Sequence, residues 1–180
     1  MGSNLNTIGG SIWLNLLNTR RVISGHRIDI LEDNDLFLKW LNDNEIFSSY
    51  TNLEKIKELR EELYFIYQEC NQFNKFHENK LNGIMRNLPV KWVTNSENGE
   101  LKFELEALDI KNESLVKILY SFIETTQNFG FEKIKQCSHD QCILFFLDTS
   151  KSGRRKWCSM ETCGNKAKAH AHYRKINDKG

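Results

Sequence analysis

Residues 135–175 read KQCSHDQCILFFLDTSKSGRRKWCSMETCGNKAKAHAHYRK, and this stretch decides the fold of the C-terminal part of the chain. Its cysteines, Cys137, Cys142, Cys158 and Cys163, follow the spacing C-x4-C-x15-C-x4-C. Zinc is bound tetrahedrally by four soft ligands, and two short cysteine pairs that come together supply them. We therefore expect these four cysteines to hold one Zn²⁺ ion.

The expected ion is structural, because four thiolates close the tetrahedron and leave no position for water. In a reducing compartment, clustered cysteines are metal ligands more often than disulfides, and four unrelated thiols are the alternative. His139 lies inside the first pair, and His170 and His172 point to different sides of a helix. We expect these histidines to face solvent or phosphate. Cys70 stands apart, as a core or half-buried thiol.

The residues between and after the cysteine pairs predict a hairpin and a helix. The apolar run 143–147 predicts a strand that leads away from the first pair, turns, and returns through Lys156 and Trp157. The alanine-rich stretch 166–175 favours a helix that starts near the metal. Together these elements indicate a treble-clef-like four-cysteine zinc finger.

The net charge of +1 conceals an asymmetry along the chain. Residues 149–180 carry nine Lys/Arg and two acidic residues, a net +7, whereas residues 1–148 carry a net −6. A basic segment on an acidic body is typical of a module that contacts nucleic-acid phosphates. The alternative is a solvated face whose cations balance the zinc thiolates. The candidate contacts are Arg154, Arg155, Lys156, Asn165, Lys166, Lys168, His172, Arg174 and Lys175.

The rest of the chain is expected to be mainly helical. Residues 12–18 read as a short buried segment, and residues 19–33 as a polar connection. Alternating residues on both sides of Asn98 and Gly99 predict a β-hairpin over 90–93 and 101–105. Hydrophobic periodicity predicts helices over 35–41, 53–76, 76–88 and 113–129.

The composition is that of a globular protein large enough for one medium domain and a small module. Of the 180 residues, 39% are hydrophobic and 27% are charged, and the single proline favours helices. No run approaches the roughly 18 apolar residues that span a bilayer, and the N-terminus lacks the layout of a secretory signal. We therefore expect a cytoplasmic protein that does not enter a membrane.

The C-terminal motifs resemble the CGNR zinc finger. That family's pattern is C-x4-C, F-x-D-x-S, R-R-x-W-C-S-M and C-G-N-R before a basic helix. Lys166 stands where the family has Arg, which keeps the charge and loses the bidentate fork. The matching residues outside the first cysteine pair are Phe146, Asp148, Ser150, Arg154, Arg155, Trp157, Cys158, Ser159, Met160, Cys163, Gly164 and Asn165.

Such fingers usually follow an N-terminal domain of the ABATE type, and residues 14–20 are similar to its L-x-F-x-N-T segment. The family is described as stress-induced transcription regulators. The resemblance therefore implies zinc binding and DNA-binding transcriptional regulation.

These observations predict a mainly α fold with a small β-hairpin (α+β class). We expect an ABATE-like helical domain over 1–130 and a CGNR-type finger over 131–180. The expected function is a zinc-dependent transcriptional regulator that contacts double-stranded DNA, with RNA or an acidic protein as the alternative partner. The helical domain would bind a small-molecule effector or form a homodimer, by analogy with bacterial regulators.

An enzyme in the N-terminal domain is the remaining alternative. Asn18, Thr19 and Arg20 are its candidate pocket residues, although the favoured interpretation is that Asn18 and Arg20 cap or brace helices. The sequence contains no H-E-x-x-H motif and no glycine-rich phosphate loop, and no nucleophile–base pairing is evident. We therefore expect no catalytic activity.

Overall fold

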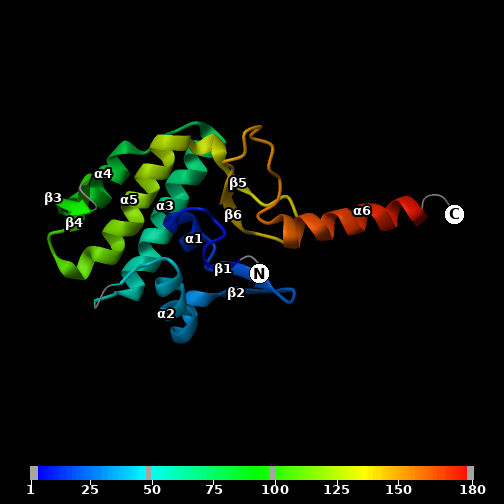
Figure 1. Ribbon diagram of the computed structural model, residues 1–180, viewed down its shortest axis with the longest axis horizontal. Helices are drawn as coiled ribbons and strands as arrows, with labels where there is room; N and C mark the ends of the chain where they lie inside the picture. Colours follow the sequence, from blue (N-terminus) through cyan, green and yellow to red (C-terminus); the bar gives the residue numbers. More distant parts are fainter. Residues whose placement is uncertain (1–3, 48–49, 98–99, 178–180) are drawn as a thin grey trace. The chain divides into compact units, whose positions relative to one another are not determined.

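The structure is a computed structural model that describes residues 4–47, 50–97 and 100–177, without the side chains at 97, 100, 102, 171, 172 and 175–177. The chain is mainly helical with small antiparallel strand pairs, as predicted (Figure 1). Backbone contacts divide the described residues into a first unit, 1–44 with 132–180, and a second unit, 45–131. The expected boundary after residue 130 adjoins the junction at 131/132, but residues 1–44 group with the C-terminal part. Among the described helices, none combines the length and the apolar character that crossing a bilayer requires.

The N-terminal part of the first unit contains a β-hairpin that was not predicted from the sequence. Ser24 and Gly25 have φ values of 51° and 83°, the left-handed conformation that a two-residue hairpin turn requires. The expected polar connection over 19–33 is therefore wrong, because most of it pairs as two strands. In chain order the elements are α1 (Ile12–Leu17), β1 (Arg20–Ile23), β2 (His26–Asp29) and α2 (Asn34–Asp43).

The C-terminal part of the first unit contains β5 (Ile134–Gln136), β6 (Phe145–Leu147), a wide turn (Met160–Gly164) and α6 (Asn165–Asn177). The predicted helix is confirmed, and it begins two residues after the last cysteine. The predicted return strand is wrong, because β6 pairs with β5, which precedes the first cysteine. Lys156 contributes a single backbone bond to the first pair's loop, its carbonyl accepting the Ser138 N–H at 2.9 Å.

Residues from the N-terminal part complete the other edge of β6. The Asn18 side chain accepts the Phe145 N–H at 2.7 Å and donates to the Phe145 carbonyl at 2.8 Å. The Gly9 carbonyl accepts the Leu147 N–H at 2.9 Å. A Cβ on Gly9 would lie 2.7 Å from the Leu14 Cβ, so only glycine fits this close approach. The edge of β6 is therefore paired on both sides within the first unit.

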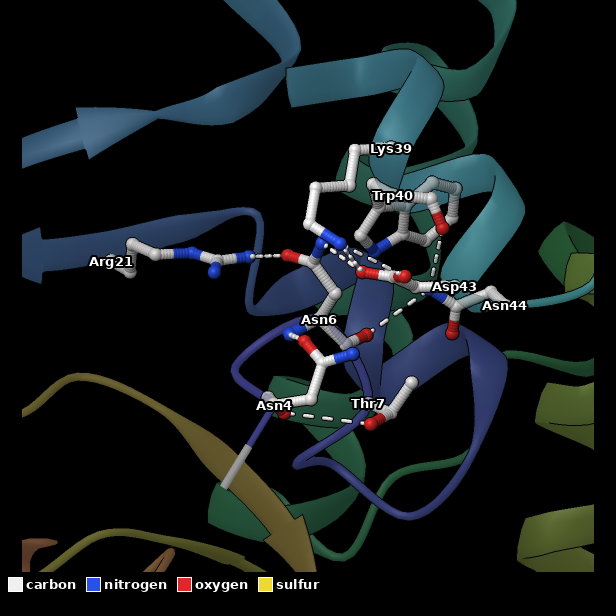
Figure 2. A network of polar contacts seen from close by, with 8 residues as sticks. All are labelled: Asn4, Asn6, Thr7, Arg21, Lys39, Trp40, Asp43 and Asn44. Atoms are coloured by element: carbon white, nitrogen blue, oxygen red, sulfur yellow. Dashed lines mark hydrogen bonds and ion pairs between the residues drawn. The ribbon is translucent and has the colours of Figure 1, made fainter. Parts of the chain in front are cut away.

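A second polar network fastens the first described residues to α2 (Figure 2). The Asn6 amide donates to the Asp43 carboxylate at 2.7 Å and accepts from the Arg21 guanidinium at 3.0 Å. The Asn44 amide donates to the Asn6 carbonyl at 3.1 Å. Arg21 is almost fully buried, and this burial lowers the pKa of its guanidinium. The network is internally satisfied, so we interpret it as structural.

The second unit is built on two long helices. α3 and α5 pack together through fully buried side chains, among them Leu63, Ile118 and Phe122. α3 ends three residues before the predicted limit, because Asn74 adopts a left-handed conformation with φ of 50°. The hairpin is confirmed, although its predicted turn at residues 98 and 99 lies outside the described residues. The elements are α3 (Leu53–Phe73), α4 (Glu78–Asn87), β3 (Val90–Glu97), β4 (Glu100–Ala107) and α5 (Glu113–Phe129).

Candidate metal centre and basic surface

Four sulfur atoms of the first unit converge on one point. The Sγ atoms of Cys137, Cys142, Cys158 and Cys163 all lie within 4.8 Å of one another. The Cys142–Cys158 and Cys158–Cys163 sulfurs are 3.8 Å and 3.7 Å apart. A tetrahedron of Zn–S bonds of about 2.3 Å has edges of about 3.8 Å. The four cysteines are thus positioned to hold one four-coordinate metal ion.

Three of these thiols shift one another's pKa values because they are close together. Hydrogen bonds from Cys142 and Cys158 hold the pKa of Cys137 far below its ordinary value. The same contact with Cys137 raises the pKa of Cys142 to about 12, and contact with both neighbours raises the pKa of Cys158. A divalent ion held by these side chains would bind them as thiolates, because metal-bound thiols are deprotonated.

The metal centre is embedded in a small apolar core drawn from both parts of the first unit. Phe146 and Leu144 are buried against the cysteines, and Trp157 packs beside them. Leu5 and Ile8, from the start of the chain, pack against the same cluster. The finger core therefore includes residues about 130 positions away in sequence, which the cysteine spacing does not reveal.

A buried carboxylate organises the loop between the cysteine pairs. Asp148 accepts hydrogen bonds from Lys135 Nζ at 2.6 Å, the Ser150 hydroxyl at 2.5 Å and the Arg155 N–H at 3.0 Å. Burial alone would raise the pKa of Asp148, but these hydrogen bonds outweigh it and hold the pKa below its usual range. The Asp and Ser of the F-x-D-x-S motif therefore shape this loop.

Arg155, one of the predicted nucleic-acid contacts, is turned inward. Its guanidinium donates to the carbonyls of Leu147, Trp157 and Cys158. The same group lies 4.4 Å from the centroid of the Phe146 ring, in cation–π geometry. These contacts hold the second cysteine pair against β6, and they use three of the five N–H donors of the guanidinium.

The other predicted contacts differ in their placement. Asn165 is exposed, but its amide donates back to the Glu161 carbonyl at 3.2 Å within the turn before α6. The side chains of His172 and Lys175 lie outside the described residues. The predicted contacts that are exposed cations are Arg154, Lys156, Lys166, Lys168 and Arg174.

The three candidate pocket residues have structural contacts. Asn18 is fully buried with its amide bonded to β6, as described above. The Thr19 hydroxyl donates to the Leu16 carbonyl at 2.7 Å, and Arg20 lies 3.5 Å from the Asp29 carboxylate. These contacts account for the three polar side chains without a ligand. The remaining cysteine, Cys70, is half-buried, and this burial raises the pKa of its thiol.

Geometry and fold together define a four-cysteine metal finger that runs into a helix. The sequence model of the CGNR zinc finger family matches residues 133–175, a range that contains all four cysteines and most of α6. This match spans less than half of the chain and concerns the finger. None of the curated proteins matches the chain.

Proposed function

We propose that this chain is a zinc-dependent transcriptional regulator that binds double-stranded DNA through the exposed cations of its finger. The proposal rests on the exposed cations of the finger that have no ion pair with a described residue. Arg154, Lys156, Lys166, Lys168 and Arg174 are exposed, and none of them forms an ion pair with a residue of the described ranges. Such uncompensated cations attract phosphate and supply most of the affinity of DNA-binding proteins.

Five lysines elsewhere in the chain are paired with carboxylates at 3.0–3.5 Å, whereas Lys55, Lys75 and Lys111 are exposed without an ion pair to a described residue. The positive charge of the paired lysines is partly neutralised within the fold, whereas that of the five exposed finger cations is not. The pairs are Lys39–Asp43, Lys57–Glu54, Lys80–Glu62, Lys91–Glu106 and Lys117–Glu113.

Zinc is the ion that we propose for the four sulfurs. Tetrahedral sets of four thiolates hold zinc or iron, and zinc is the usual ion of closed structural sites. Elemental analysis of protein purified without added metal is expected to give one zinc per chain. Iron in place of zinc, or protein that is folded and metal-free, would contradict this assignment. We assign the ion no catalytic role, because a closed site has no position for water or substrate.

Duplex binding is tested by fluorescence anisotropy with labelled genomic fragments at several salt concentrations. If about four phosphates are contacted, a plot of log K against log salt has a slope of about −4. RNA hairpins and an acidic protein serve as competitors in the same assay. The DNA proposal fails if no duplex is bound at low salt, or if RNA or the acidic protein competes better than unlabelled duplex.

We further propose that the rest of the chain corresponds to an ABATE-type domain that dimerises or binds an effector. The support is the segment 14–20, in which Asn18 and Thr19 match the family's N-T pair. In this chain Asn18 links α1 directly to β6 of the finger. Asn18 is therefore one connection through which a signal received near α1 would reach the finger. Sedimentation velocity is expected to give a species of about twice the 21.2 kDa chain mass, and a monomer would remove dimerisation from the proposal.

A further inference from the structure

A groove lies beside the metal centre, entirely within the first unit. One wall is the loop of the first cysteine pair, residues 138–141, and the other is α6 from Lys166 to Arg174. Trp157 contributes to the lining, and the volume is about 670 Å³. The groove is thus formed by the two segments that the metal would hold together.

Three cationic or titratable side chains of α6 line this groove in a single row. Lys166, His170 and Arg174 are spaced four residues apart, so they follow one face of the helix. Each step of four residues advances about 6 Å along the helix axis, a distance comparable to that between successive phosphates of one strand. His139 lines the opposite wall.

Two other charged residues, Lys168 and Asp140, serve as controls for this row. Lys168 is exposed on the same helix, yet it does not line the groove. Asp140 does line the groove, and its carboxylate is 88% exposed. A bound anion would be attracted by the row on α6 and repelled by Asp140, while Lys168 would contribute only to the general charge.

We propose that this groove holds the phosphodiester backbone of one nucleic-acid strand, with Lys166 and Arg174 contacting phosphates and His170 donating between them. This inference rests on the proposed function and specifies where and how the nucleic acid is bound. Arginine and lysine are the side chains that bind phosphate most strongly, and Trp157 offers apolar surface to the sugars. Contacts of this kind position a protein on its target without reading base sequence.

The test uses the full-length, zinc-loaded protein and a labelled duplex of random sequence at constant pH. Lys166→Gln and Arg174→Gln are each expected to weaken binding five- to twentyfold and to lower the magnitude of the salt slope by about one, because each removes a phosphate contact. Lys168→Gln removes the same charge from the same helix and is expected to weaken binding less than twofold. Asp140→Asn is expected to strengthen binding two- to fivefold.

The outcomes separate this inference from the proposal on which it rests. If the wild-type protein binds no duplex, the proposed function itself fails. If the wild-type protein binds and Lys168→Gln weakens binding as much as Lys166→Gln, the groove is not the site and only this inference is overturned. An unchanged affinity in Asp140→Asn would also count against the groove. Zinc content and circular dichroism of each variant show whether the fold is retained.

Discussion

The two units of this molecule are stabilised by different interactions. In the first unit, four sulfurs and a few buried polar side chains join segments that are far apart in sequence. In the second unit, two long helices pack through fully buried apolar side chains, with ion pairs on their surfaces. Because apolar contacts are numerous and individually weak, we expect the second unit to depend less on any single group.

The two units also differ in how many of their surface cations are paired with carboxylates. Four lysines of the second unit, Lys57, Lys80, Lys91 and Lys117, lie within 3.5 Å of a carboxylate. The exposed cations of the finger have no such partners among the described residues. The first unit thus carries exposed cations that are not neutralised by described residues, which is the property on which the proposed DNA binding depends.

The largest effect is expected from removing a metal ligand. Cys158→Ser should abolish stoichiometric zinc binding and unfold the finger, because structural zinc contributes about 10–16 kcal/mol of apparent binding free energy. Cys70→Ser is the matched control, since this thiol lies outside the four-sulfur cluster. Elemental analysis and thermal unfolding report both effects. Equal zinc content in the two variants would contradict the assigned ligand set.

A smaller loss of stability is expected from the core of the second unit. Phe122 is fully buried, and Phe122→Ala should lower the free energy of unfolding by about 3–5 kcal/mol, as large core truncations do. Phe103→Ala is the control at a side chain that is 66% exposed, with an expected change within about 0.5 kcal/mol. Zinc content should stay unchanged in both. Loss of zinc in Phe122→Ala would show that the two units are not energetically separate.

A substitution at Asn18 measures how much a single buried polar side chain contributes to the stability of the first unit. Asn18→Leu leaves the Phe145 N–H and carbonyl without their partners. Each unpaired buried group costs about 1–3 kcal/mol, so the expected loss for the two groups is about 2–6 kcal/mol. Urea denaturation measures this loss, and Asn42→Leu provides the same substitution at an exposed helical asparagine. A loss no greater than that of the control would mean that α1 is not fastened through Asn18.

The smallest effect is expected from a paired surface lysine. Lys117 lies 3.5 Å from Glu113 one turn away, and such pairs contribute about 0.3–0.5 kcal/mol. Lys117→Gln should therefore reduce stability only slightly and change DNA affinity less than twofold, in contrast to Lys166→Gln. Anisotropy titrations of the two variants side by side check the distinction between paired and unpaired cations. Equal losses of affinity would remove that distinction.

The sequence was a good guide wherever the decisive interactions are local. The cysteine spacing identified four side chains whose sulfurs do come together. The periodicity of α5 gave both of its ends correctly, because one apolar stripe and a following glycine define that helix. The hairpin at Ser24 and Gly25 was missed although its turn residues are visible, since its strands are short and largely polar.

Non-local arrangements could not be derived in the same way. Arg155 belongs to a basic run, which suggested an exposed side chain, yet it stacks on Phe146 and bonds to backbone carbonyls. Nothing near Asn18 in the sequence indicates that its partner is Phe145. The groove likewise combines a loop and a helix that are separated by the second cysteine pair. Each of these depends on how side chains and loops pack in three dimensions, which periodicity and charge patterns do not encode.

The central claim is that one metal ion organises the whole first unit, including residues near the N-terminus. Hydrogen exchange measured by mass spectrometry on the zinc-loaded chain, before and after chelation, tests it most directly. We predict that residues 9–18 and 134–147 lose protection together on chelation, because Gly9 and Asn18 bond to β6, while α3 and α5 keep theirs. Retained protection in residues 9–18, or parallel loss throughout α3 and α5, would contradict the account.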